Sequence, residues 1–300
     1  MKKLFFVAAA TALALSSCSD NEITSVVEKA QNTPISINVY SQSKTRAVTE
    51  TTTAVLQANG FKFVALNGTT EMINTTAAYD ASAGAWSYGE NVYWPTNVDT
   101  AIKFYGLYPG TVALDAANDK ATITVDGSTD VVAAYNNKSL STSTSGAVNL
   151  SFAHVLAEVQ VTAVGNNSDF TYNVTSLTLS EPATVDYTFS TGTCAATAGA
   201  ATSNFAYLTA AEAASTEAPA SLGSTVVLPA VNTTLTITYT VSKGADSNTL
   251  TKSANITGLA AGSLNVINLT LPAERTAMTF TVDNVPTWTT GGNNINATWN

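Results

Sequence analysis

Hydrophobic and polar residues alternate with a period of two in many short runs of this chain, the pattern of half-buried β-strands. The clearest run places apolar residues between threonines, at Leu235, Ile237, Tyr239 and Val241. Further strand-like segments lie at residues 61–66, 86–88, 101–108, 122–125, 147–164, 172–179, 185–189, 225–229, 264–271 and 278–282. Turn pairs such as Asn67-Gly68 and Asp126-Gly127 separate them. The sequence shows neither heptads nor a long helical stripe, so the pattern predicts an all-β chain.

The organisation of these strands predicts two β-sandwich domains. A turn-rich stretch, Gly165-Asn166-Asn167-Ser168, follows a long strand and is the natural break. The 300 residues then divide into domains of ordinary size, at residues 47–165 and 166–300. Residues 191–220 are rich in Ala, Thr and Ser, and their pattern is ambiguous. Either a strand or a short helix near residues 209–214 is compatible with it.

The first 17 residues read as an export signal. A basic start, Met1-Lys2-Lys3, precedes an apolar run over residues 4–15 that is too short for a permanent membrane span. The run ends in Leu15-Ser16-Ser17-Cys18, which resembles the bacterial lipobox. The sequence therefore predicts a lipoprotein signal peptide over residues 1–17 and lipid attachment at Cys18, with anchoring through acyl chains. The alternative is a plain signal peptide.

Residues 18–46 combine a polar tether with a first strand and a basic loop. Ile35, Ile37 and Val39 alternate with polar residues and predict a strand with one buried face. The small, polar residues 41–46 predict an exposed loop that proteases reach, and the loop ends at Arg46.

Charge and residue counts exclude several classes of function. The formal charge is −9 without a basic patch, which argues against nucleic-acid binding. One histidine and two cysteines leave no His-cluster metal site and no disulfide framework. His154, between apolar neighbours, reads as a packed histidine, and Cys194 as a structural thiol. Asp126 reads as a turn residue and not as a calcium ligand, so we expect no enzyme, metal or cofactor.

Four segments together resemble the fimbrillin family, the subunits of the type V pili of Bacteroidales. They are the early strand with Thr45-Arg46-Ala47, the aromatic stretch from Trp86-Ser87-Tyr88 through Tyr93-Trp94-Pro95 to Phe104-Tyr105-Gly106-Leu107-Tyr108-Pro109, the strand Leu150-Ser151-Phe152-Ala153-His154-Val155-Leu156-Ala157-Glu158-Val159, and Phe280-Thr281-Val282 followed by Trp288. The resemblance spans most of the chain after the lipobox.

The resemblance implies two transthyretin-like β-sandwich domains in tandem and a mechanism of assembly. A surface lipoprotein of the outer membrane is cut by an arginine-specific protease, here between Arg46 and Ala47. The strand with Ile35, Ile37 and Val39 then leaves, and a C-terminal strand of another pilus subunit fills its groove in an extracellular fimbrium.

Strand chemistry is consistent with this mechanism. Removal of an edge strand exposes apolar surface and unpaired backbone groups, and an added strand covers both. The candidate donor carries its apolar residues at alternate positions, at Met278, Phe280 and Val282. A repeated head-to-tail contact that does not close builds a filament.

Other interpretations stay open. Residues 34–40 also suit a permanent first strand, Arg46 an ordinary loop charge, and residues 278–282 an internal strand. An anchor subunit that keeps its lipid, or a glycan-binding β-sandwich with an aromatic platform at Trp86, Tyr88, Tyr93 and Trp94, is the alternative function. Surface ligands on host or bacterial cells fit either function.

Overall fold

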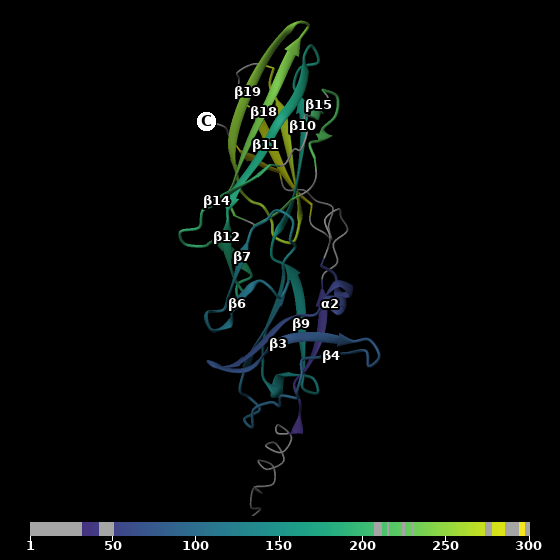
Figure 1. The fold of residues 1–300 in the computed structure, drawn as a ribbon, viewed down its shortest axis with the longest axis vertical. Helices are drawn as coiled ribbons and strands as arrows, with labels where there is room; N and C mark the ends of the chain where they lie inside the picture. Colours follow the sequence, from purple (N-terminus) through teal and green to yellow (C-terminus); the bar gives the residue numbers. More distant parts are fainter. Residues whose placement is uncertain are drawn as a thin grey trace, which may run out of the picture.

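The computed structural model describes residues 32–41, 51–206, 212–214, 216–223, 226–229, 231–273, 278–285 and 294–297. The described residues form an elongated, all-β molecule with one short α-helix, which confirms the predicted fold class (Figure 1). Within those ranges no helix has the length and apolar character needed to cross a bilayer. Cys18, Arg46 and Ala47 lie outside the described residues.

A strongly curled sheet forms one end of the molecule. In the described residues it has seven strands, in the order β1(Ser36–Ser41), β9(Ala147–His154), β8(Val132–Lys138), β5(Ile102–Tyr108), β2(Phe61–Asn67), β3(Thr70–Asp80) and β4(Ala85–Ser87). Every ladder in this sheet is antiparallel except the parallel pair of β1 with β9. The sheet therefore has β1 at one edge and β4 at the other.

The helix α2(Thr53–Asn59) packs at this end beside β1 and β3 (Figure 1). The hydroxyl of Thr52 caps its first turn by accepting a hydrogen bond from Val55 N at 3.4 Å. The helix stops at Gly60, which has φ of +72° and donates to Leu56 O at 2.8 Å. A side chain at Gly60 would also meet Ala77 O at 2.5 Å, so glycine is required at this position.

Two further sheets form the opposite end, where their inner faces pack together (Figure 1). One has β10(Ala157–Gly165), β20(Leu264–Leu271), β21(Thr279–Val285) and β22(Asn294–Ala297) in that order, with β16(Ala220–Ser221) and β17(Val226–Leu228) also on β10. The other has β14(Thr202–Ala206), β11(Thr171–Pro182), β18(Thr233–Lys243) and β19(Asp246–Ile256), with β15(Glu212–Ala214) also on β11.

The period-two pattern of the sequence is visible in β18. Leu235, Ile237 and Tyr239 are fully buried, while threonines at the alternate positions face outward. On that outer face Thr236 and Thr238 form hydroxyl contacts with Ser253 and Thr251 of β19, at 2.9 and 3.0 Å. Burial on one face and hydroxyl pairing on the other explain why this segment is a strand.

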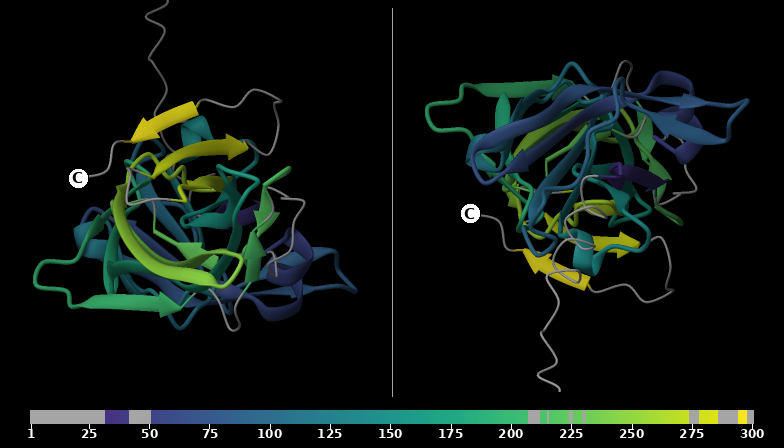
Figure 2. Two further views of the ribbon diagram at one scale, coloured as in Figure 1. Left: turned by 90° about the horizontal axis from the view of Figure 1, so that it is seen from above. Right: turned by 90° about the horizontal axis from the view of Figure 1, so that it is seen from below.

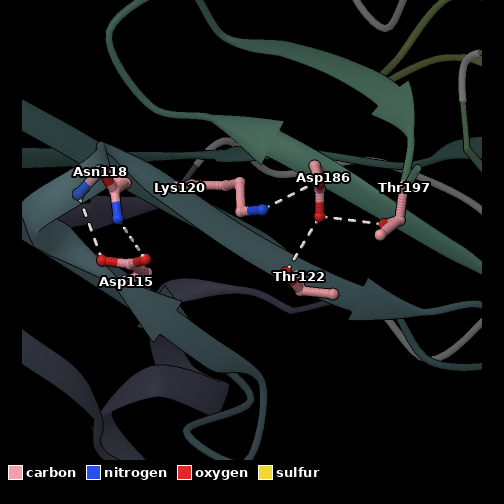
Figure 3. A network of polar contacts seen from close by, with 6 residues as sticks. All are labelled: Asp115, Asn118, Lys120, Thr122, Asp186 and Thr197. Carbon is pink, nitrogen blue, oxygen red and sulfur yellow. Dashed lines mark hydrogen bonds and ion pairs between the residues drawn. The ribbon is translucent and has the colours of Figure 1, made fainter.

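A smaller sheet lies between the two ends. Its described strands run in the order β13(Thr193–Ala196), β12(Thr184–Thr188), β7(Lys120–Thr124) and β6(Ala113–Asp115). The 3-10 helix η1(Ala116–Asn118) follows β6. A second 3-10 helix, η2(Leu140–Thr142), precedes β9 of the curled sheet. Lys120 Nζ lies 3.0 Å from Asp186 Oδ2 across the β7–β12 ladder, and Asp186 also accepts hydrogen bonds from the hydroxyls of Thr122 and Thr197 (Figure 3). On the same sheet Asp115 accepts hydrogen bonds from the backbone and side chain of Asn118.

The curled sheet separates two buried clusters. Phe61, Phe63 and Ala65 of β2 face the cluster that the sheet encloses with α2. Val64 and Leu66 face the opposite way, into a larger cluster that continues through the small sheet to the other end of the molecule. Alternate side chains of one strand thus contribute to two cores.

Strand pairing crosses the predicted domain boundary at residues 165/166 in both directions. β10 precedes the boundary and pairs with β20, and β12 follows the boundary and pairs with β7. The division into 47–165 and 166–300 therefore stays a prediction. Where a short helix near residues 209–214 was one interpretation, Glu212–Ala214 is strand β15, and residues 207–211 lie outside the described part.

Candidate functional site

The edge strand β1 is the candidate site, because it buries one face while pairing along one edge. Ile37 is the Cα partner of Val148 on β9, and Val39 is that of Leu150. The side chains of Ile35, Ile37 and Val39 are 3%, 6% and 7% exposed. Complete burial of such a side chain contributes roughly 1.5–3 kcal/mol. The predicted strand with one buried face is confirmed, while its removal stays a prediction.

The start of β1 is fixed by aromatic residues and a glycine. Ile35 N donates to Val92 O at 2.8 Å, and the Tyr88 hydroxyl donates to Ile35 O. Ser36 N and Trp94 Nε1 both donate to Gly146 O, at 3.2 and 3.1 Å. Burial raises the pKa of the Tyr88 hydroxyl above its ordinary value. The beginning of the strand is therefore attached to the segments on both of its sides.

These contacts explain most of the aromatic residues that the alternative interpretation of the sequence assigned to a sugar platform. Trp94 is 2% exposed, and its ring packs edge-on against Phe104 with centroids 5.8 Å apart. Trp86 is partly buried against Phe61, at 5.0 Å between centroids. Tyr93 is 45% exposed. Trp94 packs in the core, so the four aromatic residues do not form one exposed platform.

The end of β1 is tied to the residues that follow the basic loop. Ser41 N donates to Thr53 Oγ1 at 3.0 Å, and Ser41 Oγ donates to Thr51 O at 2.8 Å. Thr51 N donates to Asp130 Oδ2 at 3.1 Å. Ser41 and Thr51, the two described residues on either side of the segment that contains Arg46, thus lie side by side.

His154 belongs to the same hydrogen-bonded group as Thr51 and Asp130. Its Nδ1 lies 2.9 Å from Asp130 Oδ1 and 2.8 Å from Oδ2, and the residue is 6% exposed. This geometry fits the packed, hydrogen-bonded histidine that the sequence predicts. Through Asp130, His154 helps to position Thr51, the first described residue after the basic loop.

The candidate donor segment occupies an inner position in the chain's own sheet. Met278, Phe280 and Val282 are 1%, 3% and 0% exposed, and β21 pairs with β20 on one side and β22 on the other. β22 is the edge strand there, with β21 and β22 side by side in yellow (Figure 2). A donor role for this segment stays a prediction, and it requires β21 or β22 to leave this sheet.

The remaining candidates have structural explanations. Burial raises the pKa of the Cys194 thiol to about 11, which keeps it protonated and unreactive near neutral pH. Asp126 accepts hydrogen bonds from Ser128 N at 2.8 Å and Thr129 N at 2.7 Å, so its carboxylate closes a turn. Among the described residues no group of three or more metal-ligating side chains occurs.

Sequence reasoning missed the residues that hold β1 in place. Gly146 contacts the start of β1 from a distant part of the chain, Thr51 contacts its end, and the distant Asp130 holds Thr51. One local signal of this region was present in the sequence. Thr52 is a helix-capping residue before an apolar helical run, and this cap fixes where α2 begins.

Comparisons with known proteins agree with this architecture. The chain matches a fimbrillin-like family model over residues 29–288. A fimbrial protein from Bacteroides vulgatus is 18% identical, with a TM-score of 0.60, covering 85% of this chain and 98% of that one. A candidate cell adhesion protein from Parabacteroides distasonis is 10% identical, with a TM-score of 0.56, covering 89% and 96%.

A fimbrial assembly protein from Parabacteroides distasonis is 12% identical, with a TM-score of 0.48 and coverage of 84% and 96%. A comparison with curated protein sequences gives no match. The family model spans most of the chain, and the structural likeness to the Bacteroides vulgatus protein covers nearly all of that protein. This chain belongs to the fimbrillin-like family.

Proposed function

We propose that this protein is a structural subunit of a type V pilus, which is exported as a lipoprotein on Cys18, cut after Arg46 and polymerised by strand exchange. Its work is adhesive and structural, without catalysis. It begins on the outer membrane and ends in an extracellular fimbrium beside other subunits. Family membership and the fimbrial protein of similar fold support the fimbrial part of this proposal.

The position of β1 is the single observation that carries the exchange mechanism. Among the described strands β9 alone pairs with β1, yet Ile37 and Val39 of β1 and Ile35 just before it lie in the core. Departure of β1 would leave an apolar groove and one open edge on β9, which is the surface that an added strand covers. An inner strand would instead have to break ladders on both edges.

The spacing of the candidate donor matches this groove. Met278, Phe280 and Val282 repeat the alternate positions of Ile35, Ile37 and Val39. Because the side-chain period of a strand is two, such a segment can place all three side chains on the face that β1 vacates.

The location of the cut also fits the geometry. Arg46 lies in the sequence between Ser41, the last residue of β1, and Thr51 beside it, so cleavage there would separate β1 from the domain without interrupting a described strand. The hydrogen bonds of Ser41 and the burial of β1 would still hold the cut strand. Its release therefore needs a competing strand, which supports exchange and not simple loss.

The first experiment determines the N-terminus and intact mass of the protein recovered from the cell surface. We expect a chain that begins at Ala47 and assembles into oligomers that resist mild detergent. Arg46→Ala should preserve the lipidated start at Cys18 and abolish the oligomers, while Lys44→Ala, a matched change in the same loop, should alter neither. A wild-type chain that still begins at Cys18 would contradict the proposal and favour an anchor subunit.

A second experiment tests the donor. Asn149 on β9 is exposed, and Thr281 lies between two apolar positions of the candidate donor. With Asn149→Cys and Thr281→Cys in the same chain, oxidation should link subunits through a new disulfide if β21 of one subunit replaces β1 of the next. The single variants are the controls, and oligomers that form without the cross-link would point to another donor segment.

A further inference from the structure

The two edges of the curled sheet approach each other without pairing. β1 and β4 have Cα atoms within 8 Å of each other, yet among the described residues no ladder joins them. A groove of about 350 Å³ lies between them, lined by the middle of β1, by Gln57 of α2 and by Tyr79, Ala85 and Trp86. We call this groove the edge slot. Its volume is within the range of small-molecule sites, ~300–1,000 Å³.

Open backbone groups line the β1 side of the edge slot. Ser36 N points to β9, whereas Ile35 N and Ser41 N point away from β9, to Val92 O and Thr53 Oγ1. Because successive residues of a strand direct their backbone groups to alternate sides, the amides and carbonyls of Ile37 and Val39 face the slot. No described strand pairs with them there. The slot thus offers two donors and two acceptors in a row.

The width of the edge slot argues against a polypeptide as its occupant. Neighbouring strands lie ~4.8 Å apart, so a strand inserted between β1 and β4 needs them ~9.6 Å apart. Where β1 and β4 come closest, their Cα atoms are within 8 Å. An inserted strand would therefore have to open the sheet, whereas a ligand smaller than a strand would not.

The side chains of the edge slot suit a neutral, hydroxylated ligand. Tyr40 is 56% exposed at its rim, and the rings of Tyr79 and Trp86 lie 5.4 Å apart on the β4 side. Ser36 and Gln57 add a hydroxyl and an amide, while the Asn38 amide already donates to Asn149 Oδ1 at 3.0 Å, and none of the lining residues is charged. Aromatic faces pack against the C–H faces of a sugar ring, while amides and backbone groups pair with its hydroxyls.

We propose that the edge slot binds one or two units of a neutral saccharide. A negatively charged sugar would enter a slot without a cation, on a chain whose formal charge is −9. One wall of the slot is β1 itself, so binding belongs to the chain that still contains β1. The proposal therefore does not rest on cleavage: it holds for an uncut anchor subunit and for the precursor of a pilus subunit alike.

The test titrates the full chain carrying Arg46→Ala with the methyl glycosides of glucose, galactose, mannose and N-acetylglucosamine. Ligand-observed NMR measures binding. We expect at least one glycoside to bind with a Kd on the order of millimolar. Tyr40→Ala and Gln57→Ala should each weaken that binding by roughly tenfold, the loss of about 1.4 kcal/mol. Both residues lie outside the buried core, so the folded state should persist, which circular dichroism checks.

Tyr93→Ala is the matched control. Tyr93 is 45% exposed but does not line the edge slot, so this variant should bind as the parent does. Absence of binding by all four glycosides at roughly 10 mM would overturn the proposal. Binding that survives both Tyr40→Ala and Gln57→Ala would place the ligand elsewhere and overturn it as well. Tighter binding of a sialic acid glycoside than of the neutral ones would contradict the inferred chemistry.

Discussion

Lys120 and Asp186 form an ion pair across the ladder between β7 and β12, with Nζ 3.0 Å from Oδ2 (Figure 3). Lys120 precedes the predicted boundary at residues 165/166 and Asp186 follows it. Burial by itself would raise the pKa of Asp186, but hydrogen bonds from Lys120, Thr197 and Thr122 together outweigh burial and lower it. The network therefore joins two halves of the chain and favours the charged carboxylate.

Asp186→Asn should weaken this junction. The variant keeps the shape of the side chain but loses the charge that Lys120 contacts. Lys120 is 37% exposed, so solvent screening limits the ion pair, and we expect a loss of about 1 kcal/mol in the free energy of unfolding. Because the folded pKa lies below the ordinary 3.8, this stabilisation is present above that value and is lost as pH falls through the folded pKa. Urea unfolding at about pH 7 and about pH 3 measures both effects.

The pair between Lys243 and Asp169 provides the control. Its Nζ–Oδ2 distance is also 3.0 Å, but the side chains are 57% and 66% exposed. Asp169→Asn should change the free energy of unfolding by less than about 0.5 kcal/mol. Equal losses in the two variants would show that the hydroxyls of Thr122 and Thr197 add nothing to the Asp186 site.

Glu181 predicts an unusual dependence of stability on pH. Its side chain is 1% exposed and accepts a hydrogen bond from the Thr233 hydroxyl, while Oε2 has no hydrogen-bond partner in the described residues. Burial raises its pKa from 4.5 to about 8, and the Thr233 hydrogen bond lowers it only in part. The folded state therefore holds a proton that the unfolded state releases. Stability should fall as pH rises from about 4.5 to about 8, by at most roughly 5 kcal/mol.

Thermal unfolding across this pH window measures the effect. Glu181→Gln keeps a neutral side chain at every pH, so its stability should be flatter, and it should exceed that of the parent at the alkaline end. Glu90→Gln removes an exposed carboxylate and should leave the slope of the parent unchanged. A parent whose stability does not decline between these pH values would show that Glu181 ionises normally in the folded chain.

The all-β class and most strands could be predicted from the sequence because burial of one sheet face produces a local pattern of alternating apolar and polar residues. In β18 and in β1, apolar and polar residues alternate as the sheet faces do. The choice of partner strand produces no such local pattern. Ile37 lies opposite Val148, more than a hundred residues later, and nothing in either segment specifies a parallel partner. The interleaving of β10 and β12 with strands across the predicted boundary was hidden for the same reason.

Of the candidate site, only the strand β1 could be predicted from the sequence. Ile35, Ile37 and Val39 show the period of a half-buried edge, which the structure confirms. The edge slot depends on the curl that brings β4 near β1, and curl is a property of the whole sheet. Tyr79 and Tyr40 are ordinary tyrosines in the sequence, and only the three-dimensional arrangement places them at one groove.

Gly106→Ala should destabilise the enclosed core. A Cβ atom at Gly106 would lie 2.5 Å from the ring of Phe152, which is fully buried and packs against Phe61 at 4.8 Å between centroids. The ring cannot move without disturbing its neighbours, so we expect a loss of about 1–3 kcal/mol. Gly110→Ala is the comparison, because its new Cβ would make ordinary contacts of 3.7 Å or more with Lys62. Urea unfolding should separate the two variants, and similar midpoints would show that β5 and β9 adjust freely.

Gly146→Ala should weaken the attachment of β1 to the sheet, although the substitution lies outside β1. Gly146 has φ of +79°, and a Cβ there would lie 2.6 Å from Thr33 Cγ2 and 3.0 Å from Pro34 O, just before β1. The substitution thus presses on the start of the strand and disturbs the carbonyl that accepts from Ser36 N. Gly244→Ala, at φ of +63° with nothing within 4 Å, has the same backbone cost without the contact.

Hydrogen exchange followed by mass spectrometry measures the difference between these two variants. In Gly146→Ala the amides of β1 that bond to β9 should exchange at least roughly tenfold faster than in the parent, because the strand detaches more often. In Gly244→Ala they should keep the parent's protection, since the tip between β18 and β19 lies in a different sheet. If β1 is the exchangeable element, Gly146→Ala should also speed the loss of the cut strand once Arg46 is cleaved. Unchanged protection of β1 would mean that its attachment does not depend on the Gly146 turn, and that the ladder to β9, the hydrogen bonds of Ser41 and burial hold it.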